Sequence, residues 1–134
     1  MGVQVNVCEV KKVKIGGELQ DVFSLVPLAP ELSITYGTWG WLLNKAMGYG
    51  KEISCEGGYF TTKEEIEDAL NRARKALELM YKGELDLGIK PWTQEIDGEI
   101  FQYAGDSRYY SFLNTFVSIC NYELEEGYNL ICWG

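Results

Sequence analysis

Residues 61–83 carry the strongest structural signal in the chain, because every local feature of this stretch favours a helix. Thr62 and Glu65 have the spacing of a capping box, and the same template also fits one residue earlier. Apolar residues then recur at intervals of three and four, which places on one helical face Ile66, Ala69, Leu70, Ala73, Leu77 and Met80. Gly83 is positioned to end the helix in a left-handed conformation. We therefore expect a helix over about 62–82, whose apolar face the rest of the chain must cover.

Two further segments show helical periodicity. The first is about 38–48, where Thr38 is a candidate N-cap, Gly48 is a candidate stop, and the apolar face consists of Leu42, Leu43, Ala46 and Met47. The second is about 107–126, and its longer apolar stripe consists of Tyr109, Phe112, Leu113, Phe116, Val117, Cys120 and Leu124. Both segments are amphipathic, so we expect each to pack one face against a common core.

The remaining regular segments are predicted to be strands. Alternating apolar residues and the glycine pair at 16–17 predict a β-hairpin over about 3–26. Asp97-Gly98 favours a second hairpin, over about 93–103. Residues 129–133 are expected to form a short buried strand at the C-terminus. The elements together predict an α+β fold with three helices, two hairpins and this final strand.

Length and local composition bound the organisation of the chain. Its 134 residues match the size of one domain with a real core, and we predict a single domain over 1–134. No uncharged run is long enough to cross a bilayer, since even the longest, 109–122, has only 14 residues, and no N-terminal stretch has signal-peptide organisation. We therefore expect a cytoplasmic protein with no membrane partner.

Charge and residue usage exclude several classes of function. The net charge of −8 argues against a nucleic-acid partner, because phosphate binding needs a basic surface. The chain has no histidine, which removes Ser-His-Asp and Cys-His catalysis and His-ligated zinc. The glutamates within 123–126 lack metal-loop spacing and are expected on a solvated helix end. We predict no catalytic residue, no metal and no cofactor, and favour a binding protein over an enzyme.

The four cysteines are Cys8, Cys55, Cys120 and Cys132. Their spacing contains no C-x-x-C pair and matches no zinc-binding pattern. Without an export signal, we expect reduced thiols that are mostly small, buried, apolar residues.

Aromatic residues are the one compositional excess, at 13% of the chain. Four of them cluster with glycines around the short predicted helix, where flat rings beside exposed backbone N–H groups suit a planar ligand. Arg108 and Tyr109 lie at the start of the last predicted helix, where an anion is favoured. The candidate ligand-binding residues are Tyr36, Trp39, Trp41, Tyr49, Arg108 and Tyr109. The same rings are also suited to fill a core or to form a subunit interface.

The two tryptophans of this cluster are predicted to differ. Residues two apart on a helix point roughly 200° from one another. Trp39 falls on the same side as Leu42 and Leu43, so we expect it to be buried. Trp41 should point away, toward a pocket rim or a neighbouring subunit.

These observations favour a non-catalytic cytosolic binding protein that holds a small, planar, anionic, nucleotide-like ligand in an aromatic pocket, as a homo-oligomer. The alternative is an acidic protein-interaction module, such as an inhibitor or immunity-type protein, that binds a basic partner protein. The net charge of −8 fits the alternative better, because an acidic protein repels a free nucleotide at long range.

The C-terminal sequence carries a resemblance. An aromatic-rich amphipathic helix leads into Leu130-Ile131-Cys132-Trp133-Gly134. This layout resembles that of small uncharacterised bacterial and phage proteins with an I/V-x-W-G-like tail. The resemblance brings no catalytic residues and implies an origin in a bacterium or its viruses. By analogy, a phage-encoded anti-defence protein that sequesters a nucleotide immune signal fits the nucleotide-binding hypothesis.

Overall fold

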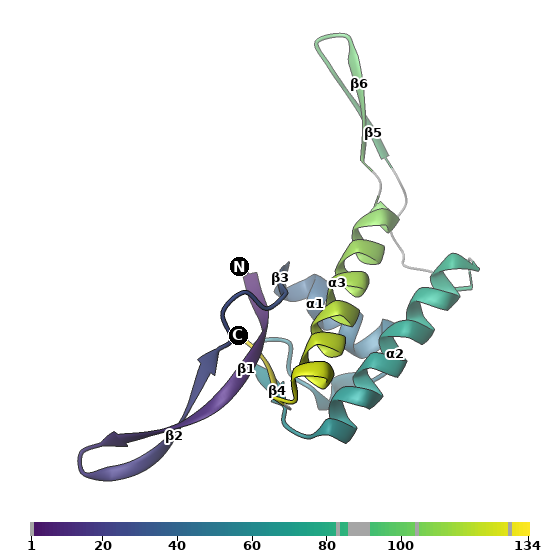
Figure 1. The fold of residues 1–134 in the computed structure, drawn as a ribbon. Coiled ribbons are helices and arrows are strands. Elements are labelled where there is room, and N and C mark those ends of the chain that lie inside the picture. The colour runs from purple at the N-terminus through teal and green to yellow at the C-terminus, as the bar shows by residue number, and fades with distance from the viewer. Residues whose placement is uncertain (1, 83, 86–91, 104, 129) are drawn as a thin grey trace.

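The computed structural model describes residues 2–82, 84–85, 92–103, 105–128 and 130–134 (Figure 1). Within these residues the chain forms three α-helices and seven strands, so the predicted α+β class is confirmed. In this part of the chain, no helix is long and apolar enough to cross a bilayer.

The main sheet has five antiparallel strands, ordered β2-β1-β7-β4, with β3 also paired to β1. Its strands are β1 (Gly2–Ile15), β2 (Glu18–Leu25), β3 (Glu31–Thr35), β4 (Gly58–Phe60) and β7 (Ile131–Trp133). The predicted first hairpin and C-terminal strand are confirmed, whereas β4 was not expected from the sequence. β7 lies between β1 and β4, so the end of the chain is held inside the sheet.

Strand β1 changes partner along its length. Residues 2–6 pair with β3, and residues 8–15 pair with β2. The hairpin turn uses Gly16 and Gly17, whose φ angles of 62° and 87° are those that a two-residue turn of this kind requires. Figure 1 shows the outer part of β1 and all of β2 extending away from the helices as a two-stranded ribbon. We call residues 9–25 the β-arm.

Helix α2 (Lys63–Tyr81) confirms the predicted central helix. Thr62 is its N-cap, and the Thr62 hydroxyl oxygen accepts the Glu65 N–H at 3.1 Å. The Glu65 carboxylate accepts a hydrogen bond from the Thr62 hydroxyl at 3.2 Å, so the capping pair is closed through side chains. The predicted stop at Gly83 lies outside the described residues.

Helix α3 (Gly105–Glu126) confirms the last predicted helix and packs antiparallel to α2. Arg74 Nη2 of α2 donates to Asn121 Oδ1 of α3 at 3.4 Å. Toward the other end of the pair, the rings of Tyr81 and Tyr110 stack with centroids 5.0 Å apart. The first turns of α2 therefore lie at the same end of the helix pair as the last turn of α3.

The short helix predicted at 38–48 begins earlier than expected. Helix α1 (Tyr36–Trp41) follows β3 directly, and its N-cap is Thr35. The Thr35 hydroxyl oxygen accepts the Thr38 N–H at 3.4 Å, so the prediction that Thr38 is the cap was wrong. The physical reason is that the last residue of the strand already has the extended backbone of an N-cap.

After α1 the chain forms a π-helical turn, η1 (Leu42–Ala46), in which the Met47 N–H donates to the Leu42 carbonyl at 2.8 Å. Gly48 then reverses the backbone at a φ of 76°, as predicted for a stop, and one 3-10 turn, η2 (Gly50–Glu52), leads toward β4. Gly40 of α1 is needed for close packing, because a Cβ at this position would lie 3.2 Å from the Cys55 Cβ.

The core lies between one face of the main sheet and the helices (Figure 1). The sheet contributes the buried side chains Val3, Val5, Val7, Leu32, Ile34, Phe60, Ile131 and Trp133. The two long helices contribute Ile66, Ala69, Leu70, Ala73, Ala76, Leu77, Met80, Leu113, Phe116, Ile119 and Cys120. The opposite sheet face carries exposed or half-buried residues, namely Gln4, Asn6, Glu31, Ser33 and Tyr59.

The second predicted hairpin is also confirmed. β5 (Trp92–Ile96) and β6 (Glu99–Tyr103) pair antiparallel around Asp97 and Gly98, whose φ angles are 51° and 83°. This hairpin forms its own two-stranded sheet, and Figure 1 shows it extending beyond the start of α3.

Candidate functional site

Trp39 lies at the centre of the core. Its side chain is 0% exposed and packs edge-on against Phe116 and Trp133, with ring centroids 5.5 and 5.7 Å away. The prediction that Trp39 occupies the buried side of its helix is confirmed. Because the ring is enclosed, it offers no surface for a ligand and acts as a core residue in this structure.

Trp41 points to a different neighbour. It is half-buried, and its ring lies 5.3 Å from the ring of Tyr109, which is itself 8% exposed. Tyr109 also contacts Phe112 edge-on, with centroids 6.3 Å apart. Trp41 therefore lies away from the contacts of Trp39, as the spacing predicts, but it attaches α1 to the first half of α3.

Tyr49 belongs to a polar cluster that joins the end of η1 to α2. The Arg72 guanidinium lies 4.3 Å above its ring, and its hydroxyl lies 3.5 Å from Asp68 Oδ2. Burial, with the nearby Asp68 charge as a smaller cause, raises the pKa of Tyr49 well above its usual value. Arg72 also donates to the Met47 carbonyl at 2.9 Å and to Asp68 at 2.8 Å. These contacts give Tyr49 a structural role, which is to attach the segment after η1 to α2.

Arg108 lines a groove of about 540 Å³ between β3, the start of β1 and the first half of α3. The groove is lined by Gly2, Val3, Gln4, Ser33, Ile34, Thr35, Arg108 and Phe112. The Arg108 side chain is exposed, and its guanidinium carbon lies 6.0 Å from the Phe112 ring centroid. One cation, two hydroxyl side chains and an aromatic ring are the groups that a small anion with a flat ring requires.

The six residues singled out from the sequence do not form one pocket. Trp39 is in the core, Trp41 and Tyr109 join two helices, Tyr49 packs on α2, and Arg108 lines the groove. The remaining residue of the set, Tyr36, is half-buried against the core at the start of α1.

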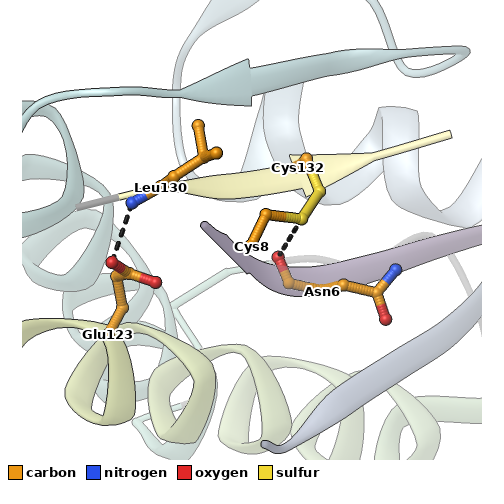
Figure 2. Close-up of a disulfide and its surroundings, with 5 residues drawn as sticks. All are labelled: Asn6, Cys8, Glu123, Leu130 and Cys132. Atoms are coloured by element: carbon orange, nitrogen blue, oxygen red, sulfur yellow. Dashed lines mark hydrogen bonds between the residues drawn. A yellow bond between two sulfur atoms is a disulfide. The ribbon is translucent and has the colours of Figure 1, made fainter. Parts of the chain in front are cut away.

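Glu123 is a buried carboxyl group. The prediction that it lies on a solvated helix end was wrong. Its side chain is 0% exposed, and Oε1 accepts the Leu130 N–H at 2.7 Å (Figure 2). Oε2 has no hydrogen-bond partner among the described residues. Burial raises the pKa of Glu123 to about 7, against the opposing effect of the Leu130 hydrogen bond. Its position three residues after Cys120, on the apolar stripe, was the signal that could have identified it.

Cys8 and Cys132 form a disulfide, so the prediction of reduced thiols was wrong for this pair (Figure 2). Cys132 lies opposite Asn6 in the β1–β7 ladder, and Cys8 is two residues further along the same face of β1. The pairing therefore follows from strand order across a sequence separation of 124 residues. Cys55 and Cys120 are free. Disulfides persist mainly in oxidising compartments, so a cytoplasmic location stays a prediction.

In the part of the chain that the structure describes, no group of three or more Cys, Asp or Glu side chains is placed to bind a metal ion. No family model matches the chain, and no curated protein sequence or solved structure is detectably similar to it.

Proposed function

We propose that the chain is a non-catalytic protein-interaction module that binds a basic surface of a partner protein. The observation that carries this proposal is a concentration of carboxylates at one end of the α2–α3 pair. We call this the acidic end, and its exposed members are Glu64, Glu65, Glu67, Glu125 and Glu126. The two groups belong together because the antiparallel packing places the start of α2 beside the end of α3.

Two of the five glutamates at the acidic end are placed where they destabilise their own helix. Glu64 and Glu65 lie in the first turn of α2, where the helix dipole favours negative charge. Glu125 and Glu126 lie at the opposite, negative end of α3, whose last turn contains no basic residue. Each carboxylate at such a position destabilises a helix by about 0.3–1 kcal/mol. A basic partner would offset this cost, which makes binding the better explanation of their placement.

Local ion pairing leaves most of the acidic end without a neutralising partner. Lys63 Nζ lies 3.8 Å from the Glu67 carboxylate. Among the residues that the structure describes, no ion pair involves the other four glutamates. An unpaired group of like charges attracts a complementary surface during encounter and raises the association rate, most strongly at low salt.

The test is a capture experiment with the tagged protein and extract of its source cell, at about 50 mM and about 500 mM salt. The variant Glu125→Lys/Glu126→Lys reverses charge at the acidic end, and Glu95→Lys/Glu99→Lys reverses the same charge on two exposed residues of the β5–β6 hairpin as a matched control. We expect the first variant and high salt each to release a basic protein that the control retains. Retention that is indifferent to salt and to the acidic-end variant contradicts the proposal.

The groove at Arg108 supports a second candidate function, binding of a small anionic ligand such as a nucleotide. The guanidinium would pair with phosphate, and Phe112 would contact the base. Calorimetric titration with a panel of nucleotides tests it, using Arg108→Ala as the variant and Trp41→Ala as the control. We expect Arg108→Ala alone to abolish binding. No heat for any nucleotide, or loss of binding only in Trp41→Ala, excludes the groove as the site.

A further inference from the structure

The β-arm exposes large apolar side chains on both of its faces. Seven of them are between 36% and 70% exposed, namely Val10, Val13, Ile15, Leu19, Val22, Phe23 and Leu25. The register places Val10 opposite Phe23 on one face and Lys11 opposite Val22 on the other. Figure 1 shows that no helix lies against the ribbon. The arm therefore has no core of its own.

A two-stranded ribbon of this kind is not expected to be stable without further contacts. Its ladder consists of eight cross-strand pairs, from Cys8 with Leu25 to Ile15 with Glu18. Among the described strands, none except these two pairs with residues 9–25. An isolated two-stranded hairpin is marginally stable in water, and an open apolar edge is prone to pair with another chain.

We infer that the β-arm is a self-association surface, covered by the β-arm of a second copy of this chain. This surface is separate from the acidic end and does not depend on the function proposed above.

The charge distribution selects a second copy as the occupant. Residues 9–25 contain three lysines and three acidic residues, so the β-arm is neutral, and the whole net charge of −8 lies elsewhere. Two copies repel each other through the rest of the molecule, and the arm is where that repulsion is smallest. Each arm also carries both signs, as in the cross-strand pair of Lys12 and Asp21, so an identical arm supplies opposite charges. A basic partner would be drawn to the body instead.

The available area fits a dimer. The apolar face continues onto Tyr59 of β4, which is 56% exposed and lies 5.7 Å from Phe23 between ring centroids. With roughly 100 Å² for each fully exposed aliphatic side chain and more for the rings, the two faces of the β-arm together with Tyr59 offer on the order of 500 Å² of apolar area per copy. A standard interface buries about 800 Å² per partner, of which a little more than half is apolar.

Leu28, at the base of the arm, is an independent sign of a covering partner. It is fully exposed and has a φ of 64°, a left-handed conformation that is unfavourable for a leucine. A strained, exposed leucine gains nothing inside the monomer. Leu25 and Leu28 line the same hollow beside β1, so Leu28 extends the apolar surface of the β-arm.

The experiment measures self-association by sedimentation velocity and light scattering from about 1 to about 200 µM, a range that brackets micromolar dimers. All proteins carry Cys55→Ser, so that an intermolecular disulfide through this half-buried thiol cannot produce a dimer. The arm variants are Phe23→Asp and Leu19→Asp. The control is Ile100→Asp, which places the same charge on an exposed residue of the other hairpin. Circular dichroism verifies the fold of each protein.

We expect a dimer whose midpoint concentration rises about tenfold or more in both arm variants and stays unchanged in Ile100→Asp. If Phe23→Asp does not fold, the test rests on Leu19→Asp, because Leu19 is 70% exposed and a charge there does not disturb packing. Leu28→Asn should weaken the dimer while the melting temperature of the monomer stays equal or rises, because Asn tolerates a positive φ. The inference is overturned if the protein is a monomer at every concentration, or if it forms a dimer whose midpoint concentration is the same in both arm variants as in the wild type.

Discussion

Replacing Glu123 by Gln should change the pH dependence of stability in a specific direction. The folded protein holds the pKa of this carboxyl at about 7, whereas its ordinary value is 4.5. Folding therefore takes up a proton between these values, and the unfolded chain binds fewer protons than the native one. The stabilising contribution is fully present below pH 4.5, decreases as the pH rises through about 7, and is constant above that. The pKa difference corresponds to about 3 kcal/mol of unfolding free energy.

The amide introduced by Glu123→Gln would keep an acceptor for the Leu130 N–H but would not titrate. Burial and the neighbouring Glu123 raise the pKa of Cys120 to about 12, and the pKa of Tyr128 is also raised, so neither group titrates between pH 5 and 8. We expect Glu123→Gln to lie within about 1 kcal/mol of the wild type at pH 5 and to exceed it by up to about 3 kcal/mol at pH 8.

The assay is urea unfolding monitored by tryptophan fluorescence at pH 5, 6, 7 and 8. Subtracting the two free energies at each pH removes the contribution of all other carboxylates. A difference that does not change over this range would show that Glu123 is ionised in the folded protein, and the reasoning from burial would be refuted.

Three further predictions concern stability. Trp39→Ala should lower the unfolding free energy by about 3–5 kcal/mol, and Trp41→Ala by less than half as much, because only the first ring is enclosed; equal losses in urea unfolding would contradict this. Cys132→Ser should cost about 2–5 kcal/mol, since the disulfide closes a loop of 124 residues, and the wild type in reducing agent should reproduce the loss. Gly58→Ala should lower the melting temperature, because the new Cβ would lie 2.6 Å from a Trp133 ring atom; an unchanged melting curve would show that the ring moves freely.

The regular elements were predictable because they depend on residues close in sequence. The Thr62–Glu65 cap and the apolar spacing of α2 are satisfied within single turns of helix. The turns at Gly16-Gly17 and Asp97-Gly98 adopt the positive φ angles that their residue types favour. The start of α1 was missed by two residues, because its cap is the last residue of a strand.

Helical periodicity also determined part of the candidate site. It separated Trp39 from Trp41, and the structure places them in different contacts. Periodicity did not show that α3 would cover Trp41, because the position of one helix relative to another depends on packing across the whole core. For the same reason, no sequence pattern indicated that Arg108 would lie beside β3 in a groove.

Only the tertiary structure determined that Cys8 pairs with Cys132, that Glu123 is buried and that the β-arm is exposed. The insertion of β7 between β1 and β4 brings Cys132 beside Cys8 and turns the Leu130 N–H toward Glu123. The β-arm is exposed because β1 leaves β3 after residue 6 and continues with β2 alone. Alternating apolar residues specify a strand, but they do not specify whether another layer of the same chain covers it. That choice depends on strand order and register, which are fixed by contacts between residues far apart in sequence.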